Sequence, residues 1–63
     1  MIDTKLMRKL RKEKGLTQGE LAEKVGVGQS AISKFEKGFD EPSIATLCRI
    51  GKVLGVDYKA LLK

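Results

Sequence analysis

Apolar residues recur along this chain at intervals of three and four, which is the spacing of one face of an α-helix. Strand patterns are missing, because apolar and polar residues do not alternate for long and aromatic residues make up only 5% of the chain. The pattern predicts an all-α, compact fold of five helices. We expect these helices over residues 2–14, 18–25, 29–37, 44–54 and 58–62.

The ends of the first four helices are marked by a glycine that an apolar residue follows directly. Such a glycine can adopt a positive φ, and the apolar residue beyond it packs back on the last turn. The pairs are Gly15-Leu16, Gly26-Val27, Gly38-Phe39 and Gly55-Val56. Helix starts are marked as well, since Thr17 and Glu20 match a capping box. Ser43 and Asp57 are the expected N-caps of the last two helices.

Helical spacing also predicts the core. On the first three helices the expected core residues are Ile2, Leu6, Leu10, Leu21, Val25, Ile32 and Phe35. On the fourth helix the expected stripe is Ile44, Leu47, Cys48, Gly51 and Leu54. We therefore expect the Cys48 thiol to be buried. Gly51 lowers helix stability by about 1 kcal/mol relative to Ala, so we expect another helix to approach closely there.

Length and composition place the chain in a narrow class. Its 63 residues predict one domain over 1–63. One Cys and no His exclude an internal disulfide and argue against a Cys/His metal site, so we expect no metal and no cofactor. A lone Cys is typical of the cytoplasm, and no apolar run is long enough to span a membrane. We expect a cytoplasmic, nucleoid-associated protein.

The net charge of +5 is concentrated near the N-terminus, where residues 1–14 carry most of the excess of Lys and Arg. A strongly basic small domain favours a polyanionic partner such as a nucleic acid. Ordinary solubility would produce the same charge, so charge alone leaves both interpretations open.

The expected helix 29–37 has two distinct faces when its residues are placed at about 100° intervals. One arc is apolar and holds Ala31, Ile32 and Phe35, while the opposite arc holds Gln29, Ser30, Ser33, Lys34 and Lys37. Glutamine can bind adenine and lysine can bind guanine in the major groove of DNA. A plain solvated helix face commonly contains the same residue types, so this face fits either interpretation.

Residues 18–37 hold a small residue, a glycine and five apolar residues at set intervals. These residues are Ala22, Gly26, Leu21, Val25, Val27, Ile32 and Phe35. Together with the flanking R-x-x-K-G-L-T-Q, E-K-G, P-S and L-G-V, the pattern resembles the helix-turn-helix domains of the phage repressor and Cro type, the XRE-like family. The resemblance covers nearly the whole chain and implies a lambda repressor-like, five-helix domain whose helix-turn-helix is 18–37.

The resemblance also implies roles for single residues. Those expected to contact DNA bases are Gly28, Gln29, Ser30, Ser33 and Lys34. Gln18 and Lys37 are expected to contact phosphates. Arg11 and Glu36 match a structural ion pair of the family, so we expect them to support the fold rather than DNA contact. The chain departs from the family at Gly28, where Ser or Thr is usual.

The function that the resemblance implies is a sequence-specific, DNA-binding transcriptional regulator that acts as a repressor. One bidentate base contact discriminates by about 1–3 kcal/mol, whereas operators need about 4–10 kcal/mol over other DNA. We therefore expect a homodimer on a palindromic operator of double-stranded DNA. The family analogy and four apolar residues place its interface at the C-terminal end. These residues are Val56, Tyr58, Leu61 and Leu62.

A protein-interaction module is the alternative function class. An antitoxin or coactivator-like module would use the same fold to hold a protein partner. An enzyme is not expected, because the chain has no His, one Cys and no carboxylate cluster. The last expected helix runs to the end of the chain, so we expect no small-molecule ligand on this chain and no membrane partner.

Overall fold

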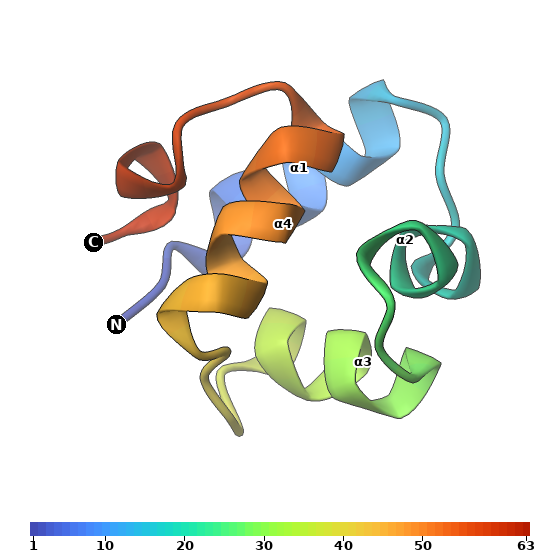
Figure 1. The fold of residues 1–63 in the computed structure, drawn as a ribbon, viewed down its shortest axis with the longest axis horizontal. Coiled ribbons are helices and arrows are strands. Elements are labelled where there is room, and N and C mark those ends of the chain that lie inside the picture. Colours follow the sequence, from blue (N-terminus) through green and yellow to red (C-terminus); the bar gives the residue numbers. More distant parts are fainter.

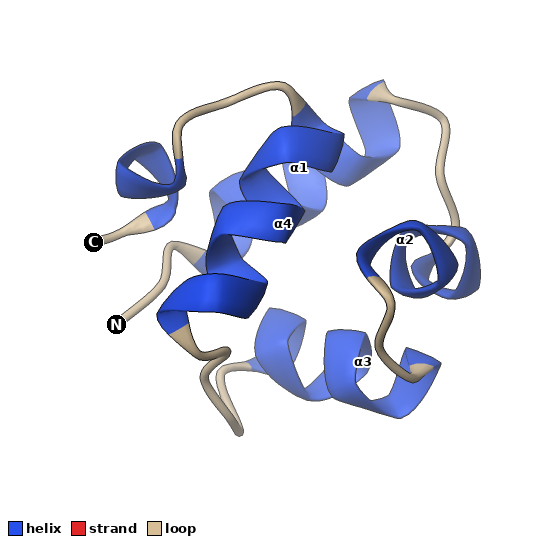
Figure 2. Cartoon of the chain, in the orientation of Figure 1, coloured by secondary structure: helices blue, strands red, loops and turns tan.

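The computed structural model describes residues 1–63, which form four α-helices and one short 3₁₀ turn. The helices are α1 (Thr4–Glu13), α2 (Gln18–Val25), α3 (Gln29–Lys37) and α4 (Ile44–Leu54). The 3₁₀ turn η1 covers Tyr58–Leu61. Helices and loops make up the molecule (Figure 2). None of the helices combines the length and apolar character needed to cross a membrane.

The prediction of a fifth helix over 58–62 is wrong, and the fold has four α-helices. Residues Tyr58–Leu61 form a single 3₁₀ turn, in which the Ala60 N–H donates to the Asp57 carbonyl at 2.9 Å. The chain leaves this turn at once because Leu62 adopts an extended backbone and pairs with Ile2 in an isolated antiparallel bridge. One turn is all that the segment can form before that pairing.

The same bridge explains why α1 begins at Thr4 instead of residue 2. Asp3 caps the helix, since its Oδ1 accepts a hydrogen bond from the Leu6 N–H at 3.1 Å. The Asp3 N–H donates to the Leu61 carbonyl at 2.6 Å, and the Lys63 N–H donates to the Met1 carbonyl at 2.9 Å. The two ends of the chain therefore lie next to each other (Figure 1).

The predicted bounds of α2, α3 and α4 are confirmed. The capping box at α2 is complete: Thr17 Oγ1 accepts from the Glu20 N–H at 3.1 Å, and Glu20 Oε1 accepts from the Thr17 N–H at 2.9 Å. The bonds with Thr17 hold the pKa of Glu20 below its ordinary value of 4.5. Gly26 closes α2 with a φ of +87°, which a residue with a side chain rarely adopts.

The core lies where α2 packs against α3 and α4, and where α1 packs against α3 and η1. Its eleven buried hydrophobic residues are Ile2, Met7, Leu21, Ala22, Val25, Ile32, Phe35, Leu47, Ile50, Leu54 and Leu61. Met7 on α1 is fully buried, although the predicted face of that helix was centred on Leu6 and Leu10. Both leucines are half-buried and pack against the cluster.

The predicted stripe on α4 is confirmed at Leu47, Gly51 and Leu54, which are buried, and is wrong at its other two residues. Cys48 is exposed, contrary to the prediction, and Ile44 is 59% exposed in the first turn. Ile50 is fully buried in their place. Gly51 is closely approached, but by backbone outside any α-helix, since a Cβ there would lie 2.7 Å from the Val56 carbonyl oxygen.

Candidate nucleic-acid interface

The outward face of α3 presents polar side chains that are free of partners within the protein. Gln29, Ser30 and Lys34 are exposed, and Ser33 is half-buried. Among all α3 side chains, only Glu36 forms hydrogen bonds with the rest of the chain. Gly28 precedes the helix with an extended backbone and offers no side-chain cap. The structure thus brings the five base-contact candidates together along the first part of one helix.

The opposite face of α3 anchors the helix to the domain. Ile32 is fully buried and Phe35 is 6% exposed, while Ala31 is half-buried against the core. The acidic residue of α3, Glu36, is also buried, so the outward face carries only neutral and basic side chains. A protruding helix face with donors and no carboxylate suits a polyanion.

Glu36 is buried and paired with Arg11 of α1. Arg11 Nε lies 2.7 Å from Glu36 Oε2, and Arg11 Nη2 lies 3.2 Å from Glu36 Oε1. The Glu36 side chain is 2% exposed and that of Arg11 is 11% exposed. Arg11 Nη1 also donates to the Leu16 carbonyl at 2.9 Å. This bidentate pair therefore fastens α1 both to the end of α3 and to the entry of α2.

Two further side chains join this cluster, and sequence reasoning assigned neither of them to it. Gln18 was expected to contact phosphate, and its Nε2 donates to Glu36 Oε1 at 3.1 Å. One of its two amide hydrogens is thereby occupied and the other is free. Arg8 Nη1 donates to the backbone carbonyl of Glu36. The signal for Arg8 was its position three residues before Arg11, on the same face of α1.

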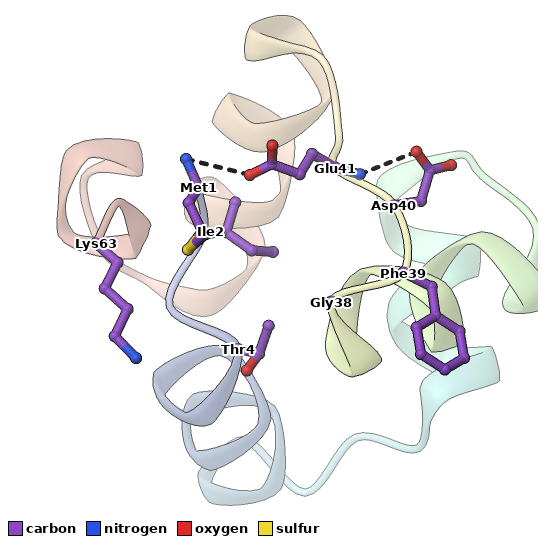
Figure 3. A pocket seen from close by; sticks show the side chains of 8 residues that line it. All are labelled: Met1, Ile2, Thr4, Gly38, Phe39, Asp40, Glu41 and Lys63. Atoms are coloured by element: carbon purple, nitrogen blue, oxygen red, sulfur yellow. Dashed lines mark hydrogen bonds and ion pairs between the residues drawn. The ribbon is translucent and has the colours of Figure 1, made fainter.

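The second phosphate-contact candidate, Lys37, is exposed in the last turn of α3. The loop after it carries Asp40 and Glu41. Asp40 Oδ1 accepts from the Glu41 N–H at 3.0 Å, and the Met1 ammonium lies 3.1 Å from Glu41 Oε1. These groups border a surface hollow between the N-terminus and the loop (Figure 3). The ammonium offsets part of the acidic charge that this loop places beside α3.

The C-terminal apolar residues divide between the core and the surface. Leu61 is fully buried, and Val56 and Tyr58 are half-buried against the core. Leu62 is 43% exposed next to the bridge with Ile2. No cluster of three His, Cys, Asp or Glu side chains that could hold a metal ion exists in the domain.

Comparison with known proteins matches this geometry to one family. The family model described as helix-turn-helix matches residues 7–61. An uncharacterized HTH-type transcriptional regulator of Methanothermobacter thermautotrophicus is 49% identical over 53 residues, which cover 84% of this chain and 77% of that protein.

Two relatives show what this fold is associated with. The transcriptional regulator SinR of Bacillus subtilis is 42% identical over 57 residues, 89% of this chain, and the match spans about half of SinR (51%). The crystal structure of SinR in complex with DNA superposes with a TM-score of 0.87 at 39% identity, covering 95% of this chain and 97% of that one. The P22 c2 repressor, solved in complex with a synthetic operator, gives a TM-score of 0.93 at 32% identity, covering 100% of this chain and 96% of that one.

Proposed function

The chain belongs to the helix-turn-helix family. We propose that it is a DNA-binding transcriptional repressor that reads the major groove of double-stranded DNA with the exposed face of α3. The observation that carries this proposal is the division of α3 between a buried anchor and an outward face without internal partners. The P22 c2 repressor and SinR have the same fold and were solved in complex with DNA, the polyanion that suits this face of α3.

Base recognition falls to the first part of α3. Gln29 offers the donor and acceptor that match adenine, and Lys34 offers donors that match the acceptors of guanine. Ser30 and Ser33 are small, so they allow the backbone of α3 to come close to the base edges. Gly28 places no side chain between the start of α3 and the groove.

Phosphate contacts position the domain without reading sequence. The start of α2 carries free backbone N–H groups and the positive end of the helix dipole, both of which favour an anion. Gln18 lies at that start with one amide hydrogen unoccupied. Lys37 supplies a positive charge in the last turn of α3.

A homodimer completes the proposal. About two base contacts at 1–3 kcal/mol each give roughly 2–6 kcal/mol, which reaches only the lower part of the roughly 4–10 kcal/mol by which specific sites exceed other DNA. A second copy doubles the number of contacts and covers that range. At the C-terminal end, the exposed Leu62 and the half-buried Val56 and Tyr58 are the residues that we assign to that contact. Two copies related by a two-fold axis would bind half-sites about one helical turn apart.

Selection of duplexes from a random library, followed by titration of the selected duplex in a gel shift, tests this function. We expect one enriched palindrome and a shift that reports two chains per duplex. Gln29→Ala and Lys34→Ala should each relax preference at one base pair by about 1–3 kcal/mol, roughly 5- to 150-fold. Their melting temperatures should match that of the unmodified chain, since neither side chain contacts the core.

Two results would contradict the proposal. Binding to DNA that is unaffected by both substitutions would remove α3 from base reading. Absence of any selected sequence would favour the other use of this fold, an antitoxin-like or coactivator-like module that holds a protein partner.

A further inference from the structure

Gly19, the second residue of α2, lies against the side chain of Gln29, the first residue of α3. A Cβ at Gly19 would lie 3.3 Å from Gln29 Oε1 and 3.8 Å from Gln29 Cδ, and its other neighbour would be Thr17 Oγ1 at 3.9 Å. Gly19 has no positive φ, so the backbone there does not require glycine. What the missing side chain provides is room for the carboxamide of Gln29.

Nothing else in the protein fixes that carboxamide. Gln29 forms no hydrogen bond within the chain and is exposed at the start of α3. On α2, the side-chain amide of Gln18 donates to Glu36. The close approach to Gly19 is therefore the contact through which the protein can influence where the carboxamide lies.

We propose that Gly19 is a specificity-determining residue of the DNA interface, because the space above it sets where the carboxamide of Gln29 lies. This inference rests on the function proposed above. A glutamine recognises adenine through two hydrogen bonds formed together, which requires both atoms of the carboxamide to be in place. A methyl group at residue 19 would displace the carboxamide by a few tenths of an ångström. We expect that displacement to weaken the pair of hydrogen bonds without abolishing it.

The structural alternative predicts a different result. Alanine is a better helix former than glycine, and the displaced group is the free end of a flexible side chain, so Gly19→Ala should not lower the melting temperature. A purely structural role for Gly19 therefore predicts no effect on DNA binding or a uniform one. A role through Gln29 predicts an effect at one base pair only.

A double-substitution cycle tests the proposal on the duplex that the unmodified chain selects and on its variants at the base pair read by Gln29. We expect Gly19→Ala to lower the preference at that base pair about three- to tenfold, a fraction of one bidentate contact. In a chain that already carries Gln29→Ala, Gly19→Ala should change neither preference nor affinity. Gly19→Leu should exceed Gly19→Ala in effect, because it fills more of the same space.

The outcomes separate this inference from the proposed function. An unchanged preference in Gly19→Ala would overturn the role of Gly19 while leaving DNA reading by α3 intact. An equal loss of affinity with and without Gln29 would also overturn it, since the methyl group would then obstruct the DNA backbone at the start of α2. If the unmodified chain selects no sequence, the proposed function fails first and the inference fails with it.

Discussion

At its N-terminal end, α3 presents Gln29 and Ser30 to solvent without a hydrogen bond to the rest of the protein, whereas at its C-terminal end Glu36 is 1% exposed. The Glu36 carboxylate accepts three hydrogen bonds, two from Arg11 and one from Gln18. The nine-residue helix α3 thus has a free end, at Gln29 and Ser30, and a fixed end, at Glu36. The difference teaches that polarity alone does not distinguish binding from support, because polar side chains occur at both ends and only one of them is buried.

The fixed end keeps the free end in position. Arg11 and Arg8 of α1 and Gln18 of α2 all reach Glu36 or its carbonyl, so α3 is tied to both preceding helices near its C-terminus. The first turn of α3 then extends from a fixed base, which favours binding because little conformational freedom is lost when DNA binds. The comparison predicts that substitutions at the two ends change different measurements.

The largest effect is expected at the fixed end. Arg11→Ala leaves a buried carboxylate without its main partner, which should lower the free energy of unfolding by about 3–5 kcal/mol. Urea unfolding measures this loss, and Lys12→Ala on the exposed face of α1 is the matched control. DNA preference of the folded fraction should be unchanged. An Arg11→Ala chain with an unchanged melting temperature and no DNA binding would break the comparison.

A smaller effect is expected from Lys37, which lies at the fixed end but points outward. Lys37→Ala should weaken binding to all DNA sequences alike and reduce the slope of log affinity against log salt by about 1. Titrations of selected and unrelated duplexes at several salt concentrations measure both quantities. A loss confined to one base pair would instead place Lys37 among the reading residues.

The smallest effect is expected at the free end, where Gly28 leaves α3 without a side-chain cap. Gly28→Ser adds an oxygen that can accept a backbone N–H of the first turn, so the free energy of unfolding should rise by a few tenths of a kcal/mol. Ser43→Ala removes an existing cap from α4, so it should lower the free energy of unfolding and shows how much one cap contributes in this protein. Thermal unfolding of both variants sharpens the comparison. A loss of stability in Gly28→Ser would show that this end is more constrained than its exposure indicates.

Local signals predicted most of the fold. Three helices begin and end where caps and glycines indicated, because such signals act within a few residues. The errors arose where the local structure depends on contacts with residues far away in the sequence. Only the pairing of Leu62 with Ile2 explains why the last segment forms one turn. On α4, helical spacing alone did not decide between a stripe through Cys48 and one through Ile50, because that choice depends on the sides from which α2 and η1 pack against α4.

Part of the candidate site could be predicted from the sequence. The angular separation on α3 predicted which residues face outward, because it depends only on the pitch of the helix. The link from Gln18 to Glu36 and the space over Gly19 join residues on different helices, so no spacing within one helix indicates them. They follow from the angle at which α2 and α3 meet.

The bridge between Ile2 and Leu62 gives the chain the connectivity of a nearly closed ring. Two backbone hydrogen bonds hold its ends together, so a short peptide could join them covalently. A circular permutant opened instead at the exposed Lys14–Gly15 turn would retain all four helices and every contact of Glu36. We therefore expect the helices to form the same surface when they are synthesised in a different order.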